Sequence, residues 1–147
     1  MTKNPGEAYL KEIRKYHGTM SKTVCVDLDG VITDFMNCKE GCDYSGYPER
    51  YHVLKRDRCP VNKDAKRALS MIKKMGFTIL IQTSRIEAER LATEKWLDKH
   101  KIPYDGLVMN KPCAFCYIDD LAVRFESWED TIADLFKMLV FGEEDGK

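Results

Sequence analysis

The sequence has no long apolar run and no excess of charge of either sign. No stretch approaches the roughly 20 apolar residues of a bilayer-spanning helix, which argues against an integral membrane protein. Residues 1–18 are polar and lack the apolar core of a secretory signal, so we expect a cytoplasmic protein. Lys plus Arg and Asp plus Glu each number 24, so no global field draws the chain to nucleic acid or a membrane surface.

The 147 residues fit one domain, and 44% of them are hydrophobic, enough for a core without disulfides. In the cytoplasm, the six cysteines predict reduced thiols. Cys38, Cys42, His52 and Cys59 could instead hold a structural Zn²⁺, but their spacing matches no common zinc pattern, and scattered thiols are the alternative we favour. Cys25 is expected in the core.

Apolar patterns predict strands alternating with helices. Strands are expected at residues 23–28, 77–82, 107–109 and 116–118, and helices after Asn62, Ser84 and Ser127. The expected buried faces hold Ala65, Ala68, Leu69, Ile72 and Met75 in the first helix, Ala88, Leu91, Ala92 and Trp96 in the second, and Trp128, Thr131, Ile132, Leu135, Phe136 and Leu139 in the third. This alternation predicts an α/β fold, a three-layer α/β/α sandwich with a Rossmann-like parallel sheet.

Two stretches lie outside this pattern. Residues 1–19 are expected to be an N-terminal extension, and residues 34–60 a small insertion after the first strand, too short for a separate domain. We therefore treat residues 1–147 as one domain.

Ligands of open α/β sheets bind beyond the carboxyl ends of the strands, so the residues at these ends carry the functional argument. The first strand ends in Asp27-Leu28-Asp29-Gly30. Residues two apart on a strand point the same way, so Asp27 and Asp29 are expected to face the crevice and Leu28 the core. Gly30 permits a sharp turn.

The second strand ends in Thr83-Ser84-Arg85. A hydroxyl beside free backbone N–H groups at a helix N-terminus forms a site for an anion. Arg85 could reach a phosphate there or be a solvated first-turn arginine, and the sequence favours neither. Each motif alone has a plain structural explanation, such as a helix cap for Thr83 and Ser84.

The expected fourth strand ends in two carboxylates, Asp119 and Asp120, and Lys111 lies shortly before this strand in the sequence. Crowded carboxylates repel one another unless a cation lies among them, and oxygen ligands favour Mg²⁺. An acidic metal pocket, an anion cradle and a lysine together indicate a phosphoryl-binding site.

The segments VCVDLDGVITDF, LIQTSR, NKP and YIDD resemble, in order, the four motifs of the haloacid dehalogenase superfamily. The resemblance covers residues 22–130 and implies a central first strand flanked by the second and fourth, with residues 34–60 as a minimal cap. It implies that Asp27 is the nucleophile, Asp29 the acid and base, Thr83 a phosphoryl ligand and Lys111 a charge-offsetting group.

The same resemblance assigns the remaining contacts. Substrate-binding residues would be Thr83, Ser84, Arg85 and Lys111. Mg²⁺ would be held by Asp27, the backbone carbonyl of Asp29 and the Asp119-Asp120 pair, with Asp119 as the direct ligand and Asp120 behind it.

Hydrolysis of a small phosphomonoester is the function these features predict, because superfamily members that cleave carbon–halogen bonds lack the second acid, here Asp29. One alternative is a phosphatase of nucleotides or nucleic-acid ends, using the basic run of residues 50–58 and suggested also by TEKWL, similar to polynucleotide kinase phosphatases. A solvated loop is the simpler interpretation of that run. A second alternative function is a non-catalytic binding module. The oligomeric state is open.

Overall fold

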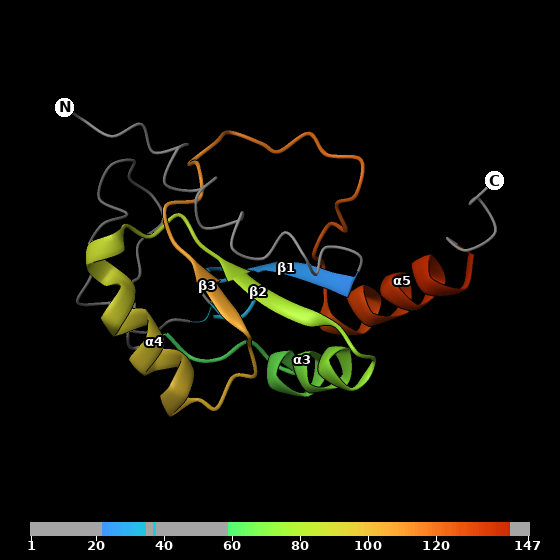
Figure 1. Cartoon of the computed structure of the whole chain (residues 1–147), viewed down its shortest axis with the longest axis horizontal. Helices are drawn as coiled ribbons and strands as arrows, with labels where there is room; N and C mark the ends of the chain where they lie inside the picture. The colour runs from blue at the N-terminus through green and yellow to red at the C-terminus, as the bar shows by residue number, and fades with distance from the viewer. Residues whose placement is uncertain (1–21, 35–36, 38–58, 142–147) are drawn as a thin grey trace.

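The structure, a computed structural model, describes residues 22–34, 37 and 59–141. In chain order its elements are β1 (Thr23–Asp27), α3 (Ala65–Lys74), β2 (Thr78–Gln82), the 3₁₀ helix η3 (Glu87–Glu89), α4 (Arg90–Lys99), β3 (Gly106–Val108) and α5 (Trp128–Phe141). Strands alternate with helices, so the predicted α/β class is confirmed (Figure 1). Within these residues, no helix has the length and apolar character needed to cross a membrane.

The sheet is open and parallel, with strand order β1-β2-β3. Val26 of β1 pairs with Ile81 of β2, which pairs in turn with Leu107 of β3. The carboxyl ends of the three strands therefore meet at one edge, where open α/β folds bind ligands. The expected central position of the first strand is wrong for the part of the chain described, where β1 is an edge strand.

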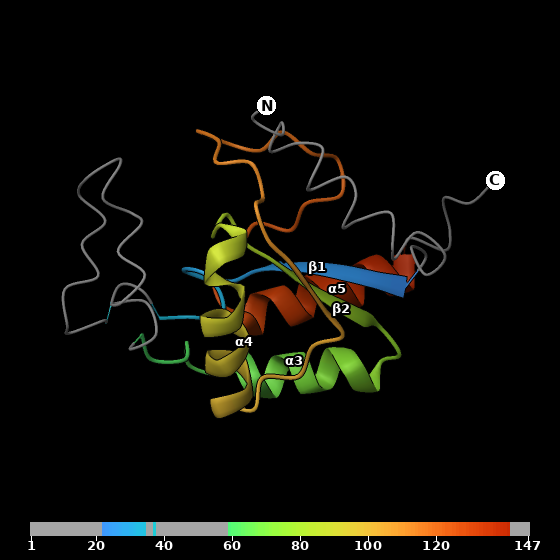
Figure 2. The same ribbon diagram turned by 60° about the vertical axis from the view of Figure 1, so that its left-hand side comes forward.

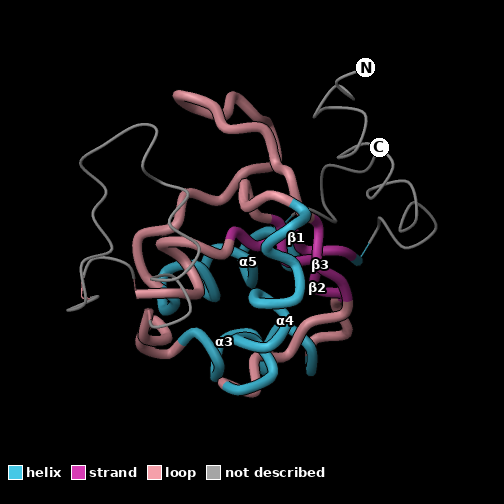
Figure 3. The backbone as a smooth tube through the Cα atoms, turned by 90° about the vertical axis from the view of Figure 1, so that its left-hand side faces the viewer, coloured by secondary structure: helices cyan, strands magenta, loops and turns pink. Residues whose placement is uncertain are grey.

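The fourth strand expected at residues 116–118 is also wrong. Residues 109–127 contain no strand or helix, and the middle of this loop arches away from the sheet in Figures 1 to 3. Ile118, the last residue of the expected strand, is fully exposed, and so is Phe115 just before it. Strand pairing is set by a partner elsewhere in the chain, and three residues with one β-branched side chain specify such a pairing weakly.

One apolar core lies between the sheet and the helices. Val26 and Leu28 from β1 and its end, and Ile79 and Ile81 from β2, belong to it. Of the predicted stripe of the first helix, Ala65, Ala68, Leu69 and Ile72 are buried, because residues three and four apart share a helix face, and Met75 at the helix end is partly buried. Helices α3, α4 and α5 lie on the same side of the sheet in Figures 1 and 2. The second helical layer of a sandwich stays a prediction.

Two predicted helix faces need correction. In the second helix, Trp96 is buried as predicted, but Ala88 and Leu91 are exposed. The short helix η3 precedes α4 and shifts the buried face, so that Thr93 and Leu97 lie beside Trp96.

In α5, Trp128 and Leu135 are buried as predicted, while Phe136 and Leu139 are exposed. Their exposure follows from the position of α5, whose last turns extend beyond the sheet in Figure 1. Cys25 is exposed too, contrary to the prediction, because it alternates with the core residue Val26 and so points to the face that the three helices leave uncovered.

The ends of the insertion, residues 34–60, lie side by side. The backbone N–H of Asp34 donates to the carbonyl of Pro60 at 2.8 Å, and Thr33 forms an antiparallel bridge with Val61. The insertion therefore leaves the fold and returns at one place. Cys59 is buried, while the other proposed zinc ligands, Cys38, Cys42 and His52, lie outside the described residues, as does the extension of residues 1–19.

Candidate functional site

The chain turns sharply where β1 ends. Leu28 is fully buried, as predicted, and separates Asp27 from Asp29 along the chain. Its carbonyl accepts the N–H groups of Ile32 and Thr33, each at 3.0 Å. Gly30 has a φ of +91°, in the left-handed region that favours glycine. The glycine therefore permits the turn that follows the two carboxylates.

Asp29 faces the guanidinium of Arg85 through two parallel hydrogen bonds. Nε donates to Oδ2 at 2.9 Å, and Nη2 donates to Oδ1 at 2.7 Å. The Arg85 side chain is 1% exposed and that of Asp29 is 15% exposed. The solvated alternative for Arg85 is therefore wrong, and its guanidinium is paired with Asp29, while contact with a substrate phosphate stays a prediction.

Asp27 faces a different cation. Nζ of Lys111 lies 3.3 Å from Oδ1 of Asp27 and 4.4 Å from the ring centre of Tyr117. Burial raises the pKa of Asp27, and the charge of Asp29 adds to this rise, while Lys111 opposes it by attraction and by its hydrogen bond. The structure thus gives each carboxylate its own cation.

The loops after β2 and β3 are held together by backbone hydrogen bonds. The N–H of Lys111 donates to the carbonyl of Thr83, and the N–H of Asn110 donates to the carbonyl of Arg85, each at 2.9 Å. Asn110 has a φ of +60°, which turns the chain at this crossing. The Thr83 side chain is buried, and its hydroxyl accepts the N–H of Arg85 at 3.2 Å. These hydrogen bonds fix the backbone position of Lys111, from which its side chain extends toward Asp27.

A helix follows Thr83 and Ser84 as expected, but its N-terminus lies farther along the chain. The chain first forms the short helix η3, and α4 begins only at Arg90. The N–H groups expected to be free are occupied, that of Arg85 by Thr83 and that of Ile86 by the carboxylate of Glu89 at 3.0 Å. The anion cradle therefore reduces to the Thr83 hydroxyl and the exposed Ser84.

The Asp119-Asp120 pair is not gathered with the β1 carboxylates. Both residues are exposed in the loop of residues 109–127, and Oδ1 of Asp119 accepts the N–H of Leu121 at 2.7 Å. Among the residues described, no three His, Cys, Asp or Glu side chains are close enough to hold a metal ion. The all-oxygen donors of Asp27 and Asp29 suit Mg²⁺ chemically, but the fit is incomplete without a carboxylate from this loop.

Two residues of the site were missed by sequence reasoning. Thr93 of α4 accepts a hydrogen bond from Nη1 of Arg85 at 3.1 Å, and it is fully buried. Tyr117 stacks its ring on Lys111 and donates its hydroxyl to the carbonyl of Pro112. A threonine on a helix face gives no signal of such a role. The closeness of Tyr117 to Lys111 in the sequence is a signal that could have been used.

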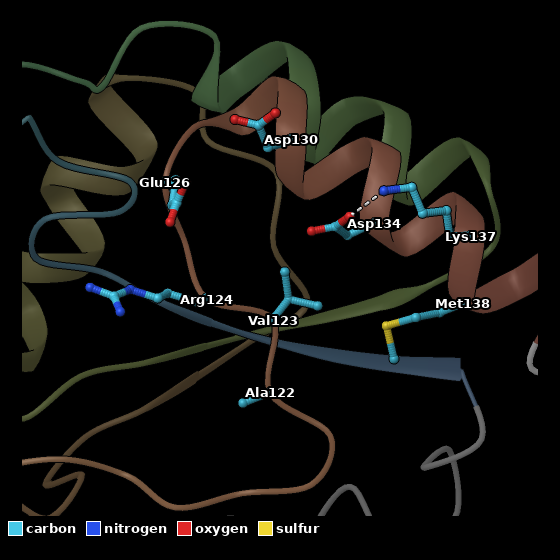
Figure 4. Close-up of a pocket in the computed structure, with 8 residues that line it drawn as sticks. All are labelled: Ala122, Val123, Arg124, Glu126, Asp130, Asp134, Lys137 and Met138. Carbon is cyan, nitrogen blue, oxygen red and sulfur yellow. Dashed lines mark hydrogen bonds and ion pairs between the residues drawn. The ribbon is translucent and has the colours of Figure 1, made fainter.

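A surface hollow of about 490 Å³ lies elsewhere, between residues 122–126 and α5 (Figure 4). Arg124, Glu126 and Met138 contribute to its lining, together with Asp134 and Lys137, which form an ion pair at 2.9 Å. None of the predicted site residues lines this hollow. The hollow is therefore separate from the predicted site.

Comparisons with known proteins give similarity in structure alone. No protein-family model matches the chain, and neither does any curated protein. The fold is similar to the crystal structure of a structural-genomics target from Vibrio cholerae, with 27% identity and a TM-score of 0.51, over 80% of this chain and 98% of that one.

Two further matches come from larger chains. One is in the Pnkp1/Rnl/Hen1 complex, with 24% identity and a TM-score of 0.47, over 84% of this chain and 35% of that one. The other is in the Pnkp1/Rnl/Hen1 RNA repair complex, with 26% identity and a TM-score of 0.46, over 80% of this chain and 30% of that one. Similarities this low carry no argument about function.

Proposed function

We propose that the protein is a phosphohydrolase of the haloacid dehalogenase superfamily that cleaves a phosphomonoester through an aspartyl-phosphate. One observation carries the proposal: two carboxylates lie at the carboxyl end of β1, and each faces a separate cation. Lys111 lies 3.3 Å from Asp27, and Arg85 lies 2.7 Å from Asp29. Two neighbouring carboxylates in different surroundings suit one nucleophile and one proton carrier.

In the first step, Asp27 attacks phosphorus. Its Oδ1 faces Lys111, so Oδ2 is the oxygen that forms the new bond, while the bond from phosphorus to the leaving oxygen breaks. The side chain of Asp27 is 37% exposed, so a substrate can reach it. Lys111 favours the ionised, nucleophilic form of Asp27 and offsets the charge of the phosphoryl group.

Asp29 would move the protons. It gives a proton to the leaving oxygen, and the resulting carboxylate then takes one from the water that hydrolyses the aspartyl-phosphate. These two transfers return Asp29 to its starting state and release inorganic phosphate and the alcohol. The proposal therefore needs Asp29 to keep one orientation through both steps.

The transferring phosphoryl group would be bound by hydroxyl groups. Thr83, whose buried oxygen accepts the N–H of Arg85, would donate its own O–H to a phosphoryl oxygen. Ser84 is exposed beside it and can contribute a second hydroxyl. We propose substrate contact for Thr83, Ser84 and Lys111, and pairing with Asp29 for Arg85.

Mg²⁺ is proposed as the cofactor. Asp27, the backbone carbonyl of Asp29 and Asp119 would hold it, with Asp120 behind Asp119, once the loop of residues 109–127 approaches the end of β1. The bound ion would neutralise charge on the phosphoryl oxygens. A small phosphorylated molecule is the proposed substrate, since the zero net charge offers no general attraction to long polyanions.

The test is hydrolysis of an aryl phosphate with Mg²⁺ by the wild type, by Asp27→Asn and by Asp98→Asn, a matched change of an exposed carboxylate on α4. We expect activity in the wild type and Asp98→Asn and none in Asp27→Asn. A wild type without turnover on aryl phosphate, on phosphorylated metabolites and on oligonucleotide ends would refute the proposal. Activity on oligonucleotide ends that falls steeply with salt would redirect the substrate assignment to nucleic acid.

A further inference from the structure

Arg85 is the most completely enclosed cation of the described residues that pair with a carboxylate. Its side chain is 1% exposed, and three of its nitrogens donate hydrogen bonds to side chains. A buried guanidinium is costly unless it is paired and hydrogen-bonded, so its partners here are fixed rather than interchangeable. Solvated arginines such as Arg67, which is 74% exposed, carry no such constraint.

The contact between Arg85 and Asp29 restricts how the carboxylate can turn. Nε and Nη2 donate one hydrogen bond to each oxygen, at 2.9 and 2.7 Å, which is the forked geometry that only a planar guanidinium provides. Rotation of the carboxylate about its bond would break both hydrogen bonds at once. Each oxygen keeps a second lone pair, directed away from Arg85, where a proton can be carried.

Arg85 is itself held by two other elements. Nη1 donates to the hydroxyl of Thr93 at 3.1 Å. Thr93 lies in α4 and is fully buried. The backbone N–H of Arg85 donates to Thr83 and its carbonyl accepts from Asn110. A continuous chain of hydrogen bonds therefore runs from α4 through Thr93 and Arg85 to Asp29.

We propose that Arg85 is a positioning residue for proton transfer, which fixes the plane of the Asp29 carboxylate and is itself aligned by Thr93. This inference rests on the proposed function of Asp29 as acid and base. In this role Arg85 acts through Asp29 and not on the substrate. By fixing this plane, Arg85 directs the proton of Asp29 away from the guanidinium. The proton would then point toward the leaving oxygen of a substrate positioned for attack by Asp27.

Leaving groups of different basicity separate positioning from structural support. An aryl oxygen leaves without a proton, whereas an alkyl oxygen needs one, so loss of proton transfer from Asp29 slows only the alkyl substrate. The measurement is the rate of leaving-group release in single turnovers, with enzyme in excess, for one aryl and one alkyl phosphate. The proteins are the wild type, Arg85→Ala, Thr93→Val and the surface control Arg67→Ala.

For Arg85→Ala we expect the alkyl rate to fall on the order of 10²-fold and the aryl rate by less than about threefold. Guanidinium ion added at low concentration should restore the alkyl rate, and ammonium ion should not, because it cannot make two parallel bonds. Thr93→Val should lower the alkyl rate by about fivefold, the effect of one hydrogen bond, and Arg67→Ala should change neither rate.

Equal losses on both substrates in a folded Arg85→Ala protein would overturn the inference and leave the proposed function standing. If Arg85→Ala fails to fold in thermal unfolding, Thr93→Val decides, and an unchanged alkyl rate in that variant overturns the inference. A wild type that hydrolyses neither substrate refutes the proposed function first, and the inference with it.

Discussion

Nζ of Lys111 lies 3.3 Å from Oδ1 of Asp27, so the loop that follows β3 is joined to the end of β1. The two residues are 84 positions apart in the sequence. Lys111 opposes the rise in the pKa of Asp27 that burial and Asp29 cause. Lys111 therefore favours the ionised form of Asp27.

Replacing Lys111 with methionine should lower activity on the order of 10²-fold near neutral pH. The pKa of Asp27 would rise further without its cation, and since a carboxylate attacks only when ionised, the acidic limb of the pH–rate profile should move to higher pH. Turnover of an aryl phosphate across the pH range measures both effects. Lys137→Met, which removes a lysine from a surface ion pair with Asp134, should leave the profile unchanged. A profile that does not move in Lys111→Met would contradict the pairing.

Mg²⁺ should draw in the loop of residues 109–127. The proposed site needs Asp119 near Asp27, so binding of the ion should slow amide-hydrogen exchange in residues 115–121. Asp119→Asn should abolish this protection, while Glu126→Gln, a matched change in the same loop, should retain it. Exchange that Mg²⁺ leaves unaltered in the wild type would remove the Asp119-Asp120 pair from the metal site.

Asp105 should contribute to stability in a pH-dependent way. Burial opposes its ionisation, but hydrogen bonds from Lys73 and from the N–H of Ile79, together with the charge of Lys73, lower its pKa. A lowered folded-state pKa gives stability that is present above the unfolded pKa of about 3.9 and is lost as pH falls through the folded value.

Asp105→Asn should therefore be less stable than the wild type at pH 7, by less than about 1 kcal/mol because water screens a pair whose side chains are about a third exposed. The difference should shrink on acidification below about pH 4. Urea unfolding at several pH values measures it. A difference that grows as pH falls would contradict the assigned sign.

Two leucines test where the core lies. Leu69 is fully buried in α3, whereas Leu91, which the sequence pattern also placed in the core, is 63% exposed in α4. Leu69→Ala should destabilise the protein by about 2–5 kcal/mol through lost burial and a cavity. Leu91→Ala should change stability by no more than about 0.5 kcal/mol. Denaturant unfolding of the two variants would contradict this account if their losses were alike.

Sequence reasoning succeeded where a structural feature depends on neighbours in the chain. The alternation around Leu28 predicted its burial, and the spacing of Ala65, Ala68, Leu69 and Ile72 predicted the buried face of α3. Parallel pairing of β1, β2 and β3 follows from the alternation of strands with helices. These features need no knowledge of distant contacts.

It failed where the outcome depends on distant contacts. Arg85 and Asp29 are separated by 56 positions, and nothing near either residue indicates that they pair. The strand expected at residues 116–118 needed a partner that local pattern cannot specify. The face of α4 was misplaced because η3 shifted the helix start.

The central claim is that Asp27 becomes covalently phosphorylated, and trapping that intermediate tests it most directly. Asp29→Asn protein lacks the base that hydrolyses the intermediate, so we expect it to accumulate a phosphoryl group from an aryl phosphate with Mg²⁺. After an acid quench, peptide mapping by mass spectrometry should locate that group on Asp27. A phosphoryl group on another residue, or turnover by the wild type with no trapped adduct in Asp29→Asn, would contradict the account.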